Sequence, residues 1–291
     1  MRRWLLFIAT NILVVSTITI LCSILGVNRY TSGGDLDYQA LFIFCMVYGM
    51  SGSFISLLIS RWMAKMMMGV QVIDPQSAGQ FDWLVQMTHD ISRRAGLPAM
   101  PEVGVYNSAE VNAFATGPTK SRALVAVSTG LISAMNRKEI EGVIGHEVAH
   151  IQNGDMVTMT LIQGVINAFV MFIARVIAFV VSQNVKQESR AMVNFLVVFV
   201  LQIGLSVLGM LVVNWFSRYR EFRADAGSAK LVGRDAMVAG LSALQRRYGM
   251  VDSSHASLTP FKISSNETTW GELFSSHPPL AKRIAALQTA V

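Results

Sequence analysis

The residues best able to do chemistry lie in one short segment, His146-Glu147-Val148-Ala149-His150. On a helix, His146 and His150 stand one turn apart on the same face, where two imidazoles can bind one Zn²⁺. Glu147 projects about 100° further round the helix, beside the metal, where a general base is needed. The alternative is a pair of exposed helix histidines with no role. Because the chain has only five histidines, this spacing favours the zinc site.

A third ligand must come from elsewhere in the chain, because a catalytic zinc usually has three protein ligands and one open position. The metzincin ligand, a histidine six residues after the second motif histidine, is excluded because that position is Met156. A carboxylate on a later helix remains, and Glu221 and Asp225 stand at i and i+4. We expect Glu221 to ligate zinc and Asp225 to accept a hydrogen bond from a ligand imidazole. Taken alone, Glu221 would be a solvated charge among arginines.

Local signals place the histidine motif on a capped helix. Asn136, followed three residues later by Glu139, is typical of an N-terminal capping box. Gly154 predicts that the helix ends near Asn153. The motif therefore lies on a helix whose two ends are both specified by the sequence.

The other polar segments predict a mixture of helices and short strands. Helices are indicated by apolar residues at helical spacing, and strands by Val-rich and aromatic stretches between Gly or Pro turns. We expect a helix over 77–95, strands over Glu102–Tyr106, Val111–Ala115 and Arg122–Val127, helices over 219–232 and 234–248, and a last helix from Pro278. The expected fold class is α+β, mainly helical, with a small β-sheet.

The composition indicates a membrane protein. Hydrophobic residues make up 52% of the 291 residues and charged residues only 14%, against roughly 25% charged in soluble domains, which excludes a disordered, collagen-like or coiled-coil chain. Each of four apolar runs is long enough to cross a bilayer as a helix, so we expect transmembrane helices over 4–27, 38–60, 156–182 and 192–216. The first is too long for a secretory signal peptide, and the last two could also be partly buried against protein.

Lysine and arginine near the run ends predict the orientation, because cytoplasmic flanks are enriched in them. On this rule, segments 61–155 and 217–291 both lie in the cytoplasm and form one catalytic domain. A hairpin of two spans returns the chain to the same side, so the histidines and Glu221 can meet. The cytoplasmic flanks hold Arg2, Arg3, Arg61, Lys65, Arg218, Arg220 and Arg223, and the opposite flanks hold Arg29, Lys186 and Arg190.

Four motifs together give a family resemblance over essentially the full length. They are NAFATG at 112–117, GHEVAHIQNGD at 145–155, EFRAD at 221–225 and SHPPLAKRI at 276–284. With the two N-terminal anchors and the hairpin, the chain resembles the HtpX family of membrane-bound zinc metalloproteases, which are related to the CAAX-prenyl proteases. The resemblance implies a gluzincin-type protease of the bacterial inner membrane, with its active site in the cytoplasm. It also implies a role in quality control and stress response, with misfolded membrane and cytoplasmic proteins as substrates.

The resemblance also implies roles for two further groups of residues. The strand of Asn112, Ala113, Phe114 and Ala115 would form the cleft edge that holds substrate backbone, the alternative being ordinary strand core. His277 would be a donor near the zinc that stabilises the oxyanion, the alternative being a helix-capping or core histidine.

The expected reaction is peptide hydrolysis with one zinc per chain, held by His146, His150 and Glu221. Zinc polarises the peptide carbonyl, and Glu147 takes a proton from the attacking water and delivers it to the leaving amine. The lipid bilayer is a partner. No Lys/Arg cluster indicates nucleic acid, and the sequence predicts no oligomeric state.

Three other functions remain as alternatives. An intramembrane protease would place the histidine helix in lipid, but that helix is too polar. A CAAX-type prenyl-protein peptidase would need more than four spans to enclose a membrane chamber. A zinc-binding sensor or transporter, which is not an enzyme, should pair ionisable residues at mid-membrane, and the runs offer only Arg175.

Overall fold

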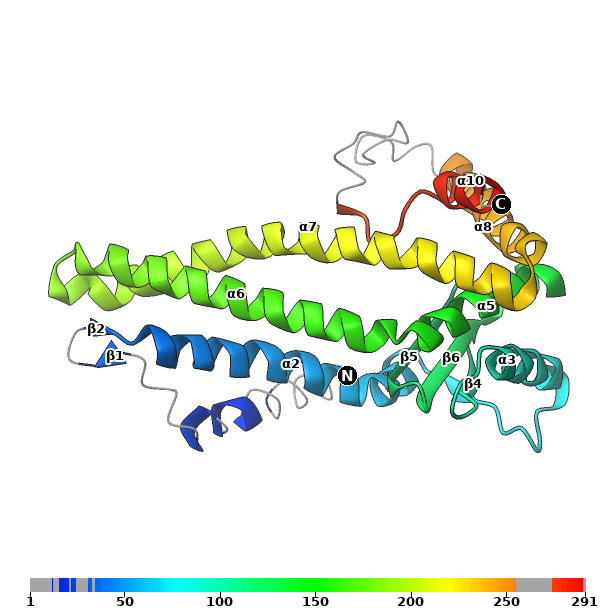
Figure 1. Cartoon of the computed structure of the whole chain (residues 1–291), viewed down its shortest axis with the longest axis horizontal. Helices are drawn as coiled ribbons and strands as arrows, with labels where there is room; N and C mark the ends of the chain where they lie inside the picture. Colours follow the sequence, from blue (N-terminus) through cyan, green and yellow to red (C-terminus); the bar gives the residue numbers. More distant parts are fainter. Residues whose placement is uncertain are drawn as a thin grey trace. The chain divides into compact units, whose positions relative to one another are not determined.

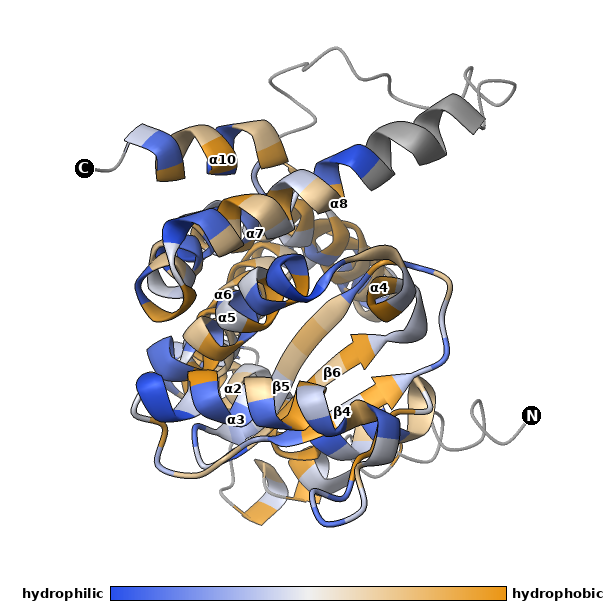
Figure 2. Ribbon diagram, turned by 90° about the vertical axis from the view of Figure 1, so that its right-hand side faces the viewer, coloured by the Kyte–Doolittle hydropathy of each residue, from blue (hydrophilic) through white to orange (hydrophobic). Residues whose placement is uncertain are grey.

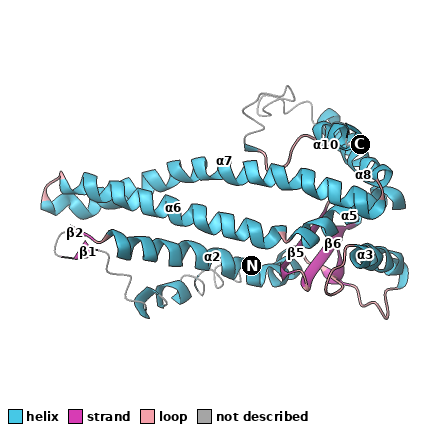
Figure 3. Cartoon of the chain, in the orientation of Figure 1, coloured by secondary structure: helices cyan, strands magenta, loops and turns pink. Residues whose placement is uncertain are grey.

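The computed structural model describes residues 12, 16–20, 22–24, 31–32, 35–254 and 274–289. Within these, the fold is mainly helical with a small mixed sheet (Figures 1 and 3). The main elements are α2 (Tyr38–Met67), β3 (Gln71–Val72), α3 (Asp82–Arg94), β4 (Glu102–Tyr106), β5 (Ala113–Thr119), β6 (Arg122–Ser128), α4 (Thr129–Ala134), α5 (Arg137–Asn153), α6 (Asp155–Gln183), α7 (Arg190–Val232), α8 (Arg234–Ser254) and α10 (Leu280–Thr289). A short pair, β1 (Thr31–Ser32) and β2 (Asp35–Leu36), precedes them.

Two compact units divide the chain. One comprises Met1–Leu57 and Thr158–Val213, and the other comprises Leu58–Val157 and Asn214–Val291. The second unit holds the four-stranded sheet together with α3, α5, α8 and α10. All the candidate site residues named above fall within this unit.

The sheet is mixed, with strand order β3-β4-β6-β5. Parallel pairing joins β4 to β6, and antiparallel pairing joins β3 to β4 and β5 to β6. Alternate residues of β6 are buried on opposite faces of the sheet: Val125 and Val127 pack into the main core with residues of α3 and α5, while Leu124 and Ala126 pack with Tyr106. Both faces are therefore covered, and β4 and β6 are largely hydrophobic along their length (Figure 2).

Three helical stretches are long and apolar enough to cross a membrane within the described part of the chain. They are α2, α6 and the stretch Gln187–Val232, which contains α7. In the first unit, α2 and α6 pack closely, because a Cβ on Gly49 would lie only 2.7 Å from the backbone nitrogen of Ala168. Small residues at such crossings let membrane helices approach each other. The predicted span 4–27 lies mostly outside the described residues and stays a prediction.

The helices expected over 192–216 and 219–232 are not separate in the structure. The fourth apolar run and the helix expected over 219–232 form one continuous helix, α7, of 43 residues. Ser217, Arg218 and Tyr219 contain no helix breaker, so the backbone stays helical where the hydropathy changes. Glu221 therefore belongs to the same helix as the fourth run.

The predicted strand Val111–Ala115 is shifted. In the structure β5 covers Ala113–Thr119, so Asn112 precedes it. The backbone of Asn112 is instead bound by Ser128, whose Oγ accepts from the Asn112 N–H at 3.1 Å. The strand continues through Gly117, where φ is 148° and a Cβ would lie 2.2 Å from the Arg122 carbonyl oxygen. Only glycine fits there, and the register shifts between Thr116 and Thr119.

Other predicted elements differ only at their ends. The strands Glu102–Tyr106 and 122–127 are confirmed, the latter extended by Ser128. The helix expected over 77–95 begins with a 3₁₀ turn at Gly79 and continues as α3. The break at Gly233 is confirmed, and α8 runs on to Ser254.

Candidate metal centre

Helix α5 carries the two histidines, and its ends follow local rules. The Asn136 side chain accepts from the Glu139 N–H at 3.0 Å, and the Glu139 carboxylate accepts from the Asn136 N–H at 2.9 Å. This capping box confirms the predicted start. The helix ends at Gly154, whose φ of 72° is left-handed and whose N–H reaches the carbonyls of His150 and Ile151.

Two glycines let neighbouring helices approach α5 closely. A Cβ on Gly142 would lie 2.2 Å from the Ala236 carbonyl oxygen of α8, and one on Gly145 would lie 2.5 Å from Ser228 Oγ of α7. Ser228 Oγ also donates to the Gly142 carbonyl at 3.0 Å. This close packing holds α5 against α7, which carries the acidic residues of the site.

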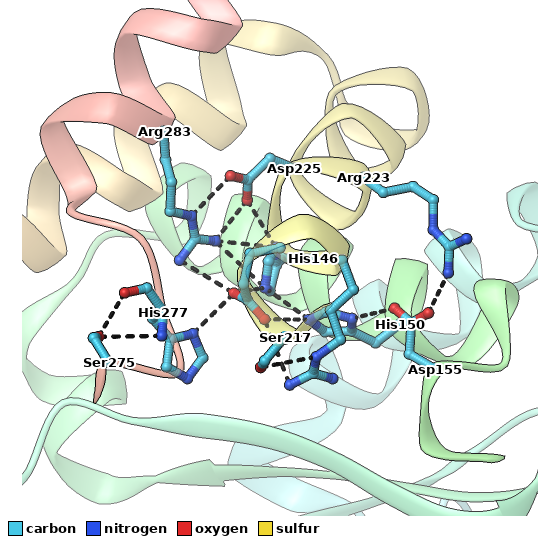
Figure 4. A network of polar contacts seen from close by, with 11 residues as sticks. His146, His150, Asp155, Ser217, Arg223, Asp225, Ser275, His277 and Arg283 are labelled. Atoms are coloured by element: carbon cyan, nitrogen blue, oxygen red, sulfur yellow. Dashed lines mark hydrogen bonds and ion pairs between the residues drawn. The ribbon is translucent and has the colours of Figure 1, made fainter. Parts of the chain in front are cut away.

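Three side chains from α5 and α7 converge on one point. Nε2 of His146 and Nε2 of His150 lie 3.0 Å apart, and each lies 3.3 Å from one carboxylate oxygen of Glu221. The candidate ligand atoms of all three residues lie within 4.8 Å of one another. All three residues are buried, Glu221 completely. Figure 4 shows the two histidines at the centre of a wider polar network.

The chemistry of this cluster fits a metal ion. Both carboxylate oxygens of Glu221 are buried without a hydrogen bond to any described residue, although ring nitrogens of His146, His150 and His277 lie 3.3, 3.3 and 3.0 Å from them. Arg283 Nη1 lies 3.3 Å from one of these oxygens and balances part of the charge, but a buried carboxylate whose oxygens lack hydrogen bonds stays costly until a further cation satisfies them. Two imidazole nitrogens and one carboxylate oxygen are a ligand set that catalytic zinc uses.

Asp225 lies beside His146, one of the candidate ligands. Its Oδ1 is 2.9 Å from Nδ1 of His146. Arg283 of α10 donates hydrogen bonds to both oxygens of the same carboxylate, at 2.8 and 2.6 Å. Both side chains are buried. Such a two-pronged pair fixes the carboxylate plane, so Asp225 can orient the His146 ring.

His277 lies at the edge of the site. Its Nδ1 is 3.0 Å from Glu221, while 59% of its side chain is exposed. Two residues of α7 hold the preceding backbone, because Asn214 donates to the Phe274 carbonyl at 2.9 Å and Arg218 to the Ser275 carbonyl at 2.8 Å. The histidine therefore faces both the carboxylate and solvent (Figure 4).

Glu147 lies on the same helix as the two histidines, and strand β5 packs against that helix. Glu147 follows His146 on α5 and is partly exposed, so a side chain next to a ligand reaches water. Strand β5 is one of the two outer strands of the described four-stranded sheet, and α5 packs against it. Ala113, Phe114 and Ala115 pair with β6 along one edge and are half-buried.

The carboxylates around His146 favour its protonated form. Burial opposes protonation, but the ring nitrogens face the carboxylates of Asp225 and Glu221, whose negative charges outweigh the burial and raise the pKa of His146 to about 9. A histidine ligates a metal only after losing its second proton. Metal binding at neutral pH therefore releases a proton, and metal affinity falls as pH drops below that pKa.

The sequence pattern of a known peptidase family, peptidase family M48, matches residues 78–291, which include every candidate site residue. The chain belongs to peptidase family M48. Membership makes it a metallopeptidase, as the sequence predicted, and the apolar helices make it a membrane metalloprotease.

Relatives within this M48 family match nearly the whole chain. A "Protease HtpX homolog" of Bacillus licheniformis is 50% identical over 295 residues, which cover 99% of this chain and 99% of the relative. "Protease HtpX" of Pasteurella multocida is 50% identical over 288 residues, which cover 99% of this chain and 98% of the relative. The resemblance to HtpX proteases is confirmed.

A solved structure shares the fold. The crystal structure of S. mikatae Ste24p matches with a TM-score of 0.65 and 17% identity, over 98% of this chain and 66% of that one. At this identity, the likeness shows the fold alone.

Sequence reasoning missed three charged residues of this M48 site. Asp155 lies 2.7 Å from Nδ1 of His150, Arg223 forms an ion pair with Asp155, and Arg283 grips Asp225. All three lie inside motifs of the sequence, at 145–155, 221–225 and 276–284, but the sequence alone assigned them no role in the site. The charges inside these motifs were the available signal.

Proposed function

We propose that this chain is a zinc-dependent endopeptidase of the bacterial inner membrane that cleaves misfolded or damaged membrane and cytoplasmic proteins in quality control and stress response. One observation carries the proposal: two imidazole nitrogens and the carboxylate of Glu221, whose oxygens make no hydrogen bond to a described residue, converge on one buried point. Because His146, His150 and Glu221 provide only nitrogen and oxygen donors, they suit zinc with one position left open.

The chain's own residues have distinct tasks in this reaction. When bound, zinc supplies Lewis acidity and lowers the pKa of water to about 7. Glu147 takes the proton of the water that attacks the peptide carbonyl, then delivers it to the leaving amine. His277 donates a hydrogen bond to the oxyanion, for which its exposed position beside Glu221 is suited. Asp225 keeps the His146 ring oriented.

Substrate backbone would bind along β5. The outer edge of this strand has no strand partner in the described sheet, and an edge of this kind accepts an extended peptide by strand addition. Ala113, Phe114 and Ala115 would contribute this edge, and Asn112 would flank it at the point where β5 begins. Strand addition recognises the backbone of the substrate rather than its side chains, which suits a protease acting on unfolded segments.

The proposed topology has four spans and places the active site in the cytoplasm. The distribution of lysine and arginine supports it, because the basic flanks adjoin segments 61–155 and 217–291. We propose that these two segments form the cytoplasmic catalytic domain, with spans 4–27, 38–60, 156–182 and 192–216 anchoring it.

Cleavage of an unfolded soluble protein by the purified chain in detergent tests this function. We expect cleavage that a chelator stops and that added zinc, but not magnesium, restores, because magnesium prefers oxygen ligands in octahedral geometry. Cleavage that survives complete removal of metal would overturn the proposal. A sensor or transporter would give no cleavage under either condition.

A further inference from the structure

Each of the two candidate ligand histidines contacts a carboxylate that is paired with an arginine. His146 presents Nδ1 to Asp225, which Arg283 holds. His150 presents Nδ1 to Asp155 Oδ2 at 2.7 Å, and Arg223 pairs with the other oxygen of Asp155. Each ring therefore has a carboxylate on the nitrogen that faces away from Glu221, and each carboxylate has its own arginine (Figure 4).

The backbone around Gly154 explains how Asp155 reaches His150. The left-handed conformation of Gly154 ends α5, and Asp155 starts α6 as its first residue. Asp155 lies only five residues after His150, and the change of direction at Gly154 lets its side chain turn back to the ring. Asp155 is completely buried, so its contact with His150 is shielded from competing water.

The hydrogen bond to Asp155 determines which nitrogen of His150 can bind a metal. When Nδ1–H donates to the carboxylate, the free lone pair of the neutral ring lies on Nε2. Nε2 is the atom that lies 3.0 Å from His146 Nε2 and 3.3 Å from Glu221. The contact at Nδ1 therefore points the ligating atom at the metal position.

Arg223 completes the arrangement from α7. It pairs with Asp155 Oδ1 while 46% of its side chain remains exposed, so each oxygen of Asp155 has one partner. The pair also joins the first turn of α6 to the part of α7 just beyond Glu221. The orientation of His150 consequently depends on how these two helix segments are held together.

We propose that Asp155 is a positioning residue for the metal, anchored by Arg223, and that it fixes the tautomer and direction of the His150 ring. The inference rests on the zinc site of the proposed function. Asp155 does not touch the metal or the substrate but acts through His150.

Zinc affinity of the Asp155→Asn variant tests this role. Asparagine keeps the size of the side chain but has no charge, and its NH₂ group, a donor, would replace the oxygen that faces either His150 or Arg223. We expect zinc to bind about 10–100-fold more weakly, as measured by competition with a chelating dye. The Arg223→Gln variant should show a smaller loss in the same assay, because removal of this half-exposed arginine leaves the contact between Asp155 and His150 in place.

Asp82→Asn is the matched control. Asp82 is likewise the first residue of a helix, α3, but it is exposed, and its side chain accepts from Gln86, one turn further along the same helix. We expect its zinc affinity to equal that of the wild-type chain. The melting temperature of each metal-free variant, measured in parallel, separates a loss of fold from a loss of metal.

Two results would overturn the inference. A lowered melting temperature for Asp155→Asn with unchanged zinc affinity would make Asp155 a merely structural residue. Equal weakening by Asp82→Asn would show a general charge effect. If the wild-type chain bound no zinc, the proposed function would fail as well, whereas zinc binding without proteolysis would remove the function and leave this inference standing.

Discussion

Replacing Glu147 with glutamine should abolish proteolysis while zinc stays bound. Glutamine keeps the size of the side chain but cannot take a proton, and general acid–base groups contribute roughly 10²–10⁴-fold to rate. Glu147 is partly exposed on α5 and is not one of the three clustered ligand residues, so the fold and the metal should be retained. The measurements are kcat on a quenched fluorescent peptide and zinc content per chain.

Glu141→Gln provides the control for this variant. Glu141 is a partly exposed glutamate of the same helix, and it lies 3.8 Å from Arg94 rather than beside the histidines. Its kcat should stay within about twofold of the wild-type value, since surface ion pairs are weak. Near-normal cleavage by Glu147→Gln, or an equal loss in Glu141→Gln, would contradict the role of Glu147 as the base.

Replacing Glu221 with glutamine should remove both the metal and the activity. Its two oxygens face His146 and His150 at 3.3 Å, and an amide would turn an N–H₂ group toward one of these rings. Loss of a residue behind a ligand already costs about 10–100-fold in metal affinity, so loss of a ligand should cost more than about 100-fold. Chelator competition measures the affinity, and circular dichroism verifies that the helices remain.

The contrast between the two glutamate variants is informative. Glu147→Gln should bind zinc and not cleave, whereas Glu221→Gln should do neither at limiting zinc. Excess zinc should restore part of the metal content of Glu221→Gln. Stoichiometric zinc of wild-type affinity in Glu221→Gln would exclude this carboxylate as the third ligand.

The helix that carries the histidines could be predicted because its signals are local. The capping box at Asn136 and the stop at Gly154 act within one turn of each helix end. The proximity of Glu221 was inferred by elimination and by the hairpin topology. The continuity of α7 could not be predicted because hydropathy marks where lipid would end, while a helix ends only where its backbone is interrupted.

Contacts between distant side chains could not be read from the sequence. Arg223 meets Asp155 across 68 positions and Arg283 meets Asp225 across 58, and such pairs depend on how the helices pack. Asp155 is only five residues from His150, but its role depends on the turn at Gly154. The limits of β5 were missed because Gly117 and Pro118 normally interrupt strands, whereas an edge strand tolerates them at an irregularity.

The X-ray absorption spectrum at the zinc edge, recorded on the intact protein with measured zinc stoichiometry, tests the central claim most directly. The account predicts one zinc per chain with only nitrogen and oxygen neighbours at about 2.0–2.2 Å, two of them imidazoles. It also predicts that the Glu221→Gln variant loses this spectrum. A sulfur neighbour, three imidazoles, or an unchanged spectrum in that variant would contradict a site built from His146, His150 and Glu221.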